Sequence, residues 1–195
     1  MRRALTGRGW TKTTFDIKKI INNVEREAIS HEIDHVKTWP DAGTIALEIE
    51  WNNKDPFFDR DLENMKRLHA EGAISVGVII TRSSTLQAGL RSAVLRFAQE
   101  NEIWSFEALL KHGVTPTPRQ QREIQVRADR SGNFAEAWSS FFVGDKFGES
   151  TTHWRKLQDR VRRGVGNPCP LLPIGLSLEV ISFSGGSLSL DALDL

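Results

Sequence analysis

The chain has 195 residues, 39% hydrophobic and 26% charged, which is typical of one globular domain, or of one with a small appendage. Its single cysteine excludes a disulfide scaffold and a cysteine-based zinc site. There is no apolar run of about 20 residues and no signal peptide, so we expect a cytoplasmic protein. The formal net charge of +1 weighs, taken alone, against a nucleic-acid-binding protein, which is usually basic.

The first fifty residues predict a hairpin of two strands. Residues 15–29 are ambiguous, because their isoleucines have helical spacing while Asn22-Asn23 is typical of a hairpin turn. Residues 33–37 form a short predicted strand, residues 40–43 (PDAG) a turn, and residues 44–51 a second strand with alternating apolar and polar side chains.

The middle of the chain alternates helices with a buried strand. Asp55-Pro56 predicts a helix N-terminus, with Asp55 as the cap, and Gly72 the end of that helix. The run AISVGVIIT at residues 73–81 is typical of a strand covered on both faces. Residues 84–101 then predict an amphipathic helix, so the order of elements indicates an α/β protein.

The last third contains fewer regular patterns. Residues 112–133 are interpreted as a long surface excursion within a single domain that covers residues 1–195, and the chain after about residue 182 as a loose tail. Residues 154–163 predict a basic helix with five basic side chains and one acidic one. Residues 171–176 predict a further strand, which Pro173 would confine to a sheet edge or a bulge.

The predicted hairpin brings carboxylates together. An antiparallel pair with its turn at residues 41–42 places Asp34 opposite Glu48 and Glu50, whereas Asp41 lies at the far end. Grouped carboxylates raise one another's pKa unless a cation compensates them, and their hard oxygen atoms suit Mg²⁺. The plainer alternative is that Glu48 and Glu50 occupy the solvent-facing side of a half-exposed strand.

Several ordered blocks carry a family resemblance. The segments DHVK and ALEIE, which contain Asp34, Glu48 and Glu50, resemble the catalytic hairpin of the PD-(D/E)xK nuclease superfamily. The segments WNNKDPFFDRDL, ISVGVIITR and RGVGNPCPLLPIG extend the resemblance to type II restriction endonucleases related to BglII, BstYI and BamHI. The resemblance begins around Trp10 and covers most of residues 30–176.

The resemblance implies an α/β restriction-endonuclease-like fold, with a central mixed sheet flanked by helices. It makes Asp34 and Glu48 the Mg²⁺ ligands and Asp34, Glu48 and Glu50 the catalytic residues. Glu50 replaces the superfamily's lysine, as glutamine does in the BglII-like enzymes and glutamate does in BamHI, so it would orient the attacking water or ligate a second metal. An upstream acidic residue sometimes joins such sites, and Glu25, Glu27 and Glu32 are the candidates here.

The implied function is Mg²⁺-dependent hydrolysis of double-stranded DNA at a specific palindromic site, leaving 5′-phosphate and 3′-hydroxyl ends. The implied partners are a second copy of the chain, with the helix at residues 84–101 as a candidate dimer face, and a cognate methyltransferase as a separate protein. The alternatives are a repair or phage-type nuclease and a non-catalytic DNA-binding protein of the same fold.

Two segments are candidate DNA contacts. The polar residues after the second strand can touch a phosphate, and the loop GESTTH with the basic helix after it can reach base edges and the backbone. Alternatively, Ser150 or Thr151 serves only as a helix cap. The predicted contacts are Asn52, Asn53, Lys54, Ser150, Thr151, Thr152, His153, Lys156 and Arg160. This basic helix also explains the near-neutral charge, because its positive charge is balanced by the acidic residues at 34–63 and in the tail.

Overall fold

The computed structural model describes residues 1–183, apart from the side chains of Arg26 and Glu27. The predicted loose tail therefore lies almost entirely outside the described residues. The chain divides into two compact units, one of residues 1–82 with 152–175, the other of residues 83–151 with the chain from 176 onward. The single domain expected over residues 1–195 stays a prediction.

The first unit is built on a mixed five-stranded sheet in the order β1-β2-β3-β4-β5. The β1–β2 and β2–β3 pairs are antiparallel, and the β3–β4 pair is parallel. The predicted strands are therefore present in a sheet that mixes both directions. Their bounds are Thr11–Ile21 (β1), Val24–Trp39 (β2), Gly43–Glu50 (β3), Val76–Arg82 (β4) and Leu171–Leu176 (β5).

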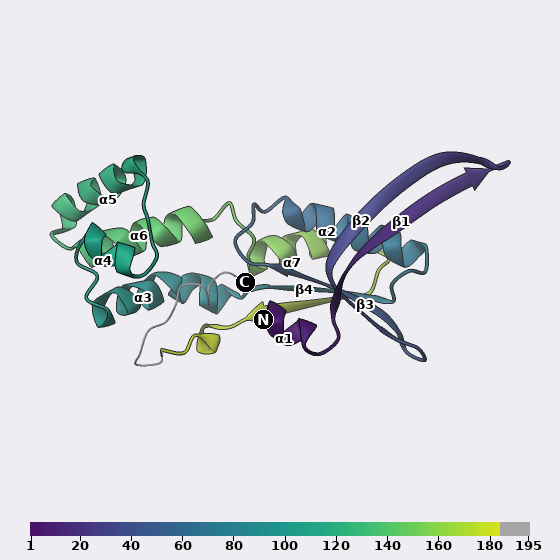
Figure 1. Ribbon diagram of the computed structural model, residues 1–195, viewed down its shortest axis with the longest axis horizontal. Helices are drawn as coiled ribbons and strands as arrows, with labels where there is room; N and C mark the ends of the chain where they lie inside the picture. The colour runs from purple at the N-terminus through teal and green to yellow at the C-terminus, as the bar shows by residue number, and fades with distance from the viewer. Residues whose placement is uncertain (184–195) are drawn as a thin grey trace. The chain divides into compact units, whose positions relative to one another are not determined.

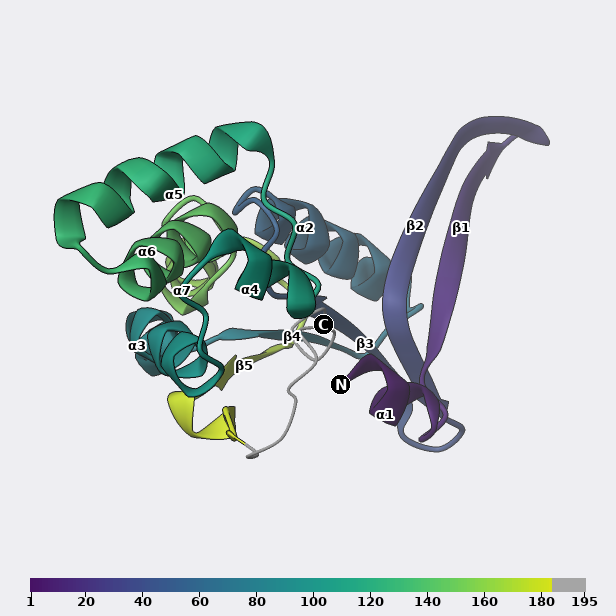
Figure 2. The same cartoon turned by 60° about the vertical axis from the view of Figure 1, so that its left-hand side comes forward.

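The first two strands form a long hairpin that extends beyond the rest of the sheet (Figure 1 and Figure 2). Asn22 and Asn23 both have positive φ, 51° and 62°, which is the conformation that a two-residue hairpin turn requires. Of the two interpretations of residues 15–29, the hairpin is confirmed and the helix is wrong. Only His35–Trp39 of β2 pairs with β3, so most of β2 pairs with β1 alone.

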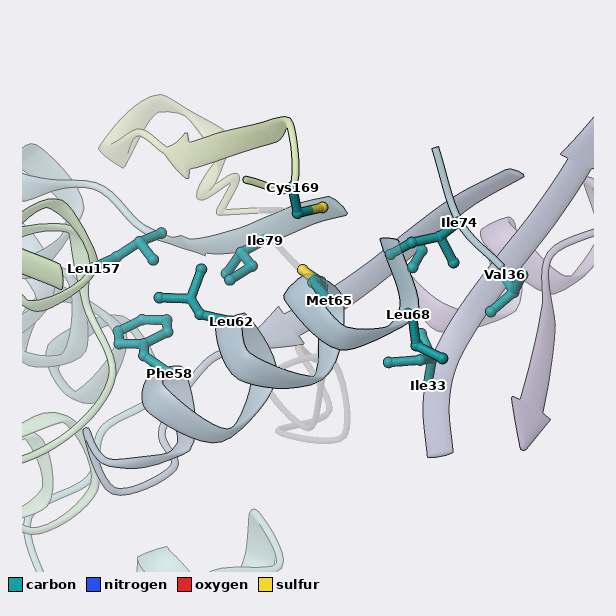
Figure 3. Packing of buried hydrophobic residues seen from close by; sticks show 11 residues of the cluster. Ile33, Val36, Phe58, Leu62, Met65, Leu68, Ile74, Ile79, Leu157 and Cys169 are labelled. Atoms are coloured by element: carbon teal, nitrogen blue, oxygen red, sulfur yellow. The ribbon is translucent and has the colours of Figure 1, made fainter. Parts of the chain in front are cut away.

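Helix α2 (Phe57–Ala70) covers the sheet and makes its core. Its buried side chains meet those of β2, β3, β4 and helix α7 (Trp154–Arg162), as Figure 3 shows. The helix begins at Phe57, and no side chain caps it, so the prediction of Asp55 as its cap is wrong. The buried cluster consists of Ile33, Val36, Ala46, Phe58, Leu62, Met65, Leu68, Ile74, Ile79, Leu157 and Cys169.

The strand order explains the remaining strand patterns. The predicted strand at residues 73–81 is β4, which lies between β3 and β5 and is buried from Gly77 to Arg82. The strand β5 lies at the edge of the sheet, where Pro173 removes no ladder hydrogen bond from a second neighbour. A short helix, α1 (Arg2–Thr6), precedes β1.

The second unit is helical. Its core is made mainly by α3 (Ser84–Glu100), α4 (Phe106–Lys111), α5 (Pro118–Ser131) and α6 (Phe134–Phe147), and a short 3₁₀ helix, η1 (Leu178–Val180), lies against α3. Helix α3 confirms the predicted amphipathic helix. The interpretation of residues 112–133 as a loop is wrong, because α5 starts there with a capping box between Thr117 and Gln120. No helix among the described residues is long and apolar enough to cross a membrane.

Candidate active site

Glu48 and Glu50 lie on the central strand β3 and are nearly inaccessible, with 5% and 2% of their surfaces exposed. They share their strand face with Ala46, which belongs to the core beneath α2. The alternative that they occupy a solvent-facing side is therefore wrong. Glu48 and Glu50 thus occupy the covered face of an interior strand, a position at which side chains are normally apolar.

Asp34 lies next to Glu48, as the hairpin predicted. His35 pairs with Leu47, and the backbone N–H of Asp34 donates a hydrogen bond to Glu48 Oε1 over 3.3 Å. The Asp34 side chain is 43% exposed, and Lys12 Nζ lies 3.9 Å from its Oδ1. Of the three carboxylates of Asp34, Glu48 and Glu50, only that of Asp34 is therefore accessible to solvent, and the two glutamates are buried.

A further carboxylate, that of Asp61, joins the group from α2. It is 1% exposed, and its carboxyl group interacts with that of Glu50, whose pKa it raises. Sequence analysis missed it, although it lies three residues after Phe58 and next to Leu62, on the buried face of a helix. An acidic residue on an apolar stripe is the signal that could have found it.

Two of the three proposed upstream acidic residues, Glu25 and Glu32, are paired with lysines and do not join this group. Glu32 pairs instead with Lys12 (2.7 Å) and Glu25 with Lys18 (3.3 Å) along the hairpin. The side chain of Glu27 is outside the described residues. Among the described side chains, an additional acidic one comes from the helix after the hairpin.

Burial sets the electrostatics of the site. Burial, together with the nearby carboxylates of Asp61 and Asp34, raises the pKa of Glu48 to about 8. Burial also raises the pKa of Glu50 to about 8, reinforced by Asp61, and it raises the pKa of Asp61. The guanidinium of Arg60 opposes these shifts, but it does not outweigh the effect of burial.

The loop after β3 orients Glu50. Asn53 Nδ2 donates a hydrogen bond to Glu50 Oε2 over 3.0 Å, while Asn52 and Lys54 are exposed. The backbone N–H of Thr152 donates to the Asn53 carbonyl oxygen over 2.8 Å, which fastens the start of α7 to this loop. The structure thus brings Asn53 to the carboxylates, and Asn53 is exposed to solvent together with its two neighbours.

The predicted DNA contacts in the GESTTH loop differ in their exposure to solvent. Ser150 is exposed, whereas Thr151, Thr152 and His153 are 3%, 0% and 3% exposed. The alternative role of Ser150 or Thr151 as a helix cap is wrong, because α7 is preceded by His153 and has no side-chain cap. Thr151 Oγ1 donates instead to the Gly148 carbonyl oxygen over 2.7 Å.

On α7, Lys156 and Arg160 are engaged in ion pairs. Arg160 is 7% exposed, and its Nε and Nη2 each donate to Asp59 over 2.9 Å. Lys156 Nζ lies 3.3 Å from Asp55 Oδ2. Arg160 is therefore an internal ion-pair residue that ties α7 to α2, and it would have to leave Asp59 to reach a phosphate.

The donor set suits a hard divalent cation. No three acidic, histidine or cysteine side chains within residues 1–183 are close enough to form a complete metal-binding group on their own. Mg²⁺ does not require one, because it usually takes one or two carboxylates with waters and substrate phosphate oxygens. Asp34 and Glu48, joined through the 3.3 Å hydrogen bond, provide carboxylates of that kind, and a cation would offset the charge that burial disfavours.

Comparisons with known proteins identify one family. The family model described as restriction endonuclease BglII/BglIII matches residues 1–176. The match includes the segment before Trp10, where the resemblance in the sequence begins. No curated protein and no solved structure matches the chain significantly.

Proposed function

Because the chain belongs to the BglII/BglIII restriction endonuclease family and is thereby a type II restriction endonuclease with this family's α/β fold, we propose that it hydrolyses double-stranded DNA at a palindromic site in a Mg²⁺-dependent reaction. The observation that supports the proposal is the burial of Glu48 and Glu50 beside Asp34 on the central strands. Buried carboxylates are destabilising unless they serve a site, so this arrangement favours catalysis over a purely structural role.

Each residue has a proposed role. Asp34 and Glu48 hold the cation, which when bound polarises the scissile phosphate and eases deprotonation of water. Glu50, oriented by Asn53, positions the attacking water and accepts its proton. The bond from phosphorus to the 3′-oxygen breaks, the 3′-oxygen takes up a proton, and the products carry 5′-phosphate and 3′-hydroxyl ends.

The DNA contacts proposed for this chain are the exposed residues of two loops. Asn52 and Lys54 flank Asn53 and can reach a phosphate next to the scissile bond. Ser150 is the exposed member of the GESTTH loop, while Thr151, Thr152 and His153 would reach DNA only through rearrangement of buried side chains. Lys156 would exchange its ion pair with Asp55 for a phosphate.

The protein is proposed to act as a homodimer, because a palindromic site matches a two-fold symmetric protein in which each subunit cuts one strand. The apolar stripe of α3 is buried within the second unit, so a dimer through α3 would use its exposed polar side, which carries Arg91 and Arg96. Analytical ultracentrifugation with and without DNA tests this. A separate methyltransferase that protects the same site is the expected cellular partner.

Cleavage of plasmid DNA tests the function directly. With Mg²⁺, the unmodified protein is expected to give discrete fragments, and Asp34→Ala and Glu48→Ala are expected to give none while still binding DNA. Asp41→Ala, at the exposed far end of the hairpin, is the matched control and should cleave normally. A smear of random fragments would favour a repair or phage-type nuclease, and DNA binding without cleavage by the unmodified protein would refute the proposal.

A further inference from the structure

Asp61 occupies a position on α2 where an apolar residue would be expected. The neighbouring buried residues of the same helix face are Phe58, Leu62, Met65 and Leu68, all of them in the core of the first unit. A carboxylate that is 1% exposed on such a face is costly unless its surroundings stabilise its charge. Its contacts therefore indicate what it does there.

One oxygen atom of Asp61 is held and the other is not. Arg60 donates to Oδ1 from Nε (2.9 Å) and from Nη2 (2.8 Å), and its guanidinium lies over the Phe57 ring. Oδ2 is buried and receives no hydrogen bond from any protein donor in the described part of the chain. Asp61 and Glu50 are in contact as carboxyl groups, so a hydrogen bond between them requires a shared proton.

The cationic partner of this group, Arg60, is held by Asp61 but not by Glu50. Arg60 is 54% exposed, and its Nη2 lies 3.8 Å from Glu50 Oε1, beyond hydrogen-bonding distance. One solvent-accessible guanidinium thus faces two buried carboxylates, with Glu48 a short distance along the same strand face. When the carboxyl groups of Glu48, Glu50 and Asp61 ionise, as a bound cation would favour, their negative charge exceeds the single positive charge of Arg60.

We propose that Asp61 is a positioning residue of this site, whose buried carboxylate abuts Glu50, fixes that side chain and adds negative charge that strengthens the binding of a divalent cation by the neighbouring carboxylates. The inference rests on the proposed function. Asp61 acts through Glu50 and through the local potential, and it is not itself one of the cation's ligands. Metal sites regularly contain carboxylates that contact and orient the metal's ligands without contacting the metal itself.

The competing explanation is that Asp61 only anchors Arg60 and the start of α2. In that case the substitution Asp61→Asn would lower the melting temperature in EDTA and leave cation affinity unchanged. On our proposal the amide removes a buried negative charge, so stability in EDTA is kept or rises and cation affinity falls. The two explanations therefore predict opposite combinations of results.

The experiment is isothermal titration of the full-length protein with Mg²⁺, and separately with Mn²⁺, at pH 8.5 without DNA. Asp61→Asn is expected to weaken cation binding roughly 10- to 100-fold, as loss of a supporting residue does at other metal sites. The matched control is Glu63→Gln, an exposed carboxylate on the same helix, paired with Lys66 and Arg67, which should bind cations within twofold of the unmodified protein.

A second variant covers the case in which Asp61→Asn does not fold. Arg60→Met removes a largely exposed cation and leaves the carboxylates in place, so cation affinity should rise severalfold. An unchanged or weaker affinity of Arg60→Met, or an affinity of folded Asp61→Asn within twofold of the unmodified protein, overturns the inference. If the unmodified protein cleaves DNA with Mg²⁺ and only these results fail, the proposed function stands; if it neither binds Mg²⁺ nor cleaves, both fail.

Discussion

Replacing Glu48 by glutamine is expected to make the protein more stable above neutral pH when divalent cations are removed. Glu48 has a pKa of about 8 in the folded protein, well above its usual 4.5, because it is buried next to Asp61 and Asp34. Between pH 4.5 and pH 8 the side chain of Glu48 is therefore ionised in the unfolded chain and protonated in the folded protein. The folded state therefore loses free energy relative to the unfolded state as pH rises through this range.

The magnitude follows from linkage. Where the folded state binds one proton more than the unfolded state, each pH unit changes the free energy of unfolding by about 1.4 kcal/mol. From pH 6.5 to pH 8.5 a group with a folded pKa of about 8 loses most of its proton, so Glu48 should account for about 2 kcal/mol of the decline in stability. For a chain of this length that corresponds to a shift of about 4–8 °C in melting temperature.

The assay compares thermal unfolding of the unmodified protein and Glu48→Gln in EDTA at pH 6.5 and pH 8.5. The quantity of interest is the difference between the two proteins, because His31, His35 and His153 are common to both and their lowered pKa values affect both alike. The pH-dependent decline should be smaller in the variant, and Mg²⁺ should raise the melting temperature of the unmodified protein at pH 8.5 but raise that of the variant less. Equal pH dependence in the two proteins would show that Glu48 ionises normally and would refute the reasoning.

Three further substitutions probe other parts of the structure. Asp59→Ala leaves the buried guanidinium of Arg160 without its bidentate partner and should lower the free energy of unfolding by about 2 kcal/mol in urea; a change below about 0.5 kcal/mol would contradict an internal role for Arg160. Leu62→Ala removes a fully buried side chain between α2 and the sheet and should cost about 3 kcal/mol in the same assay, whereas a neutral effect would contradict the packing. Lys54→Ala should weaken DNA binding uniformly across sequences and reduce the slope of log affinity against log salt by about 1, measured by fluorescence anisotropy, and an unchanged slope would exclude a phosphate contact.

The hairpin and the sheet strands could be predicted because their patterns are local. The turn residues at 40–43 fix the β2–β3 register, and that register alone places Asp34 beside Glu48. Gly43 illustrates how specific the turn is, because it has a φ of 104° and a Cβ atom there would collide with the side chain of Ser75. A periodic pattern likewise revealed α3, whose apolar stripe recurs over four turns.

What sequence analysis missed depends on contacts between elements. The two prolines, two glycines and many charges of residues 112–133 predict a loop, yet Thr117 and Gln120 form a capping box and Ile124 and Ala128 supply the buried face. The charge of α7 suggested a DNA-facing surface, but Arg160 turns inward to Asp59, and this pairing across 101 residues has no local signature.

The site itself shows why an acidic pattern alone cannot identify its members. Glu25 and Glu32 lie closer in sequence to Asp34 than Asp61 does, yet each is held by a lysine along the hairpin. Asp61 is brought to Glu50 because α2 must lay its apolar stripe on the sheet, and the same packing that buries Phe58 and Leu62 buries the carboxylate between them. The hydrophobic core and the acidic site therefore depend on the same helix. Helix α2 stabilises the fold, and it also carries the carboxylate that we infer strengthens cation binding. A change in the packing of α2 should therefore alter both stability and cation affinity.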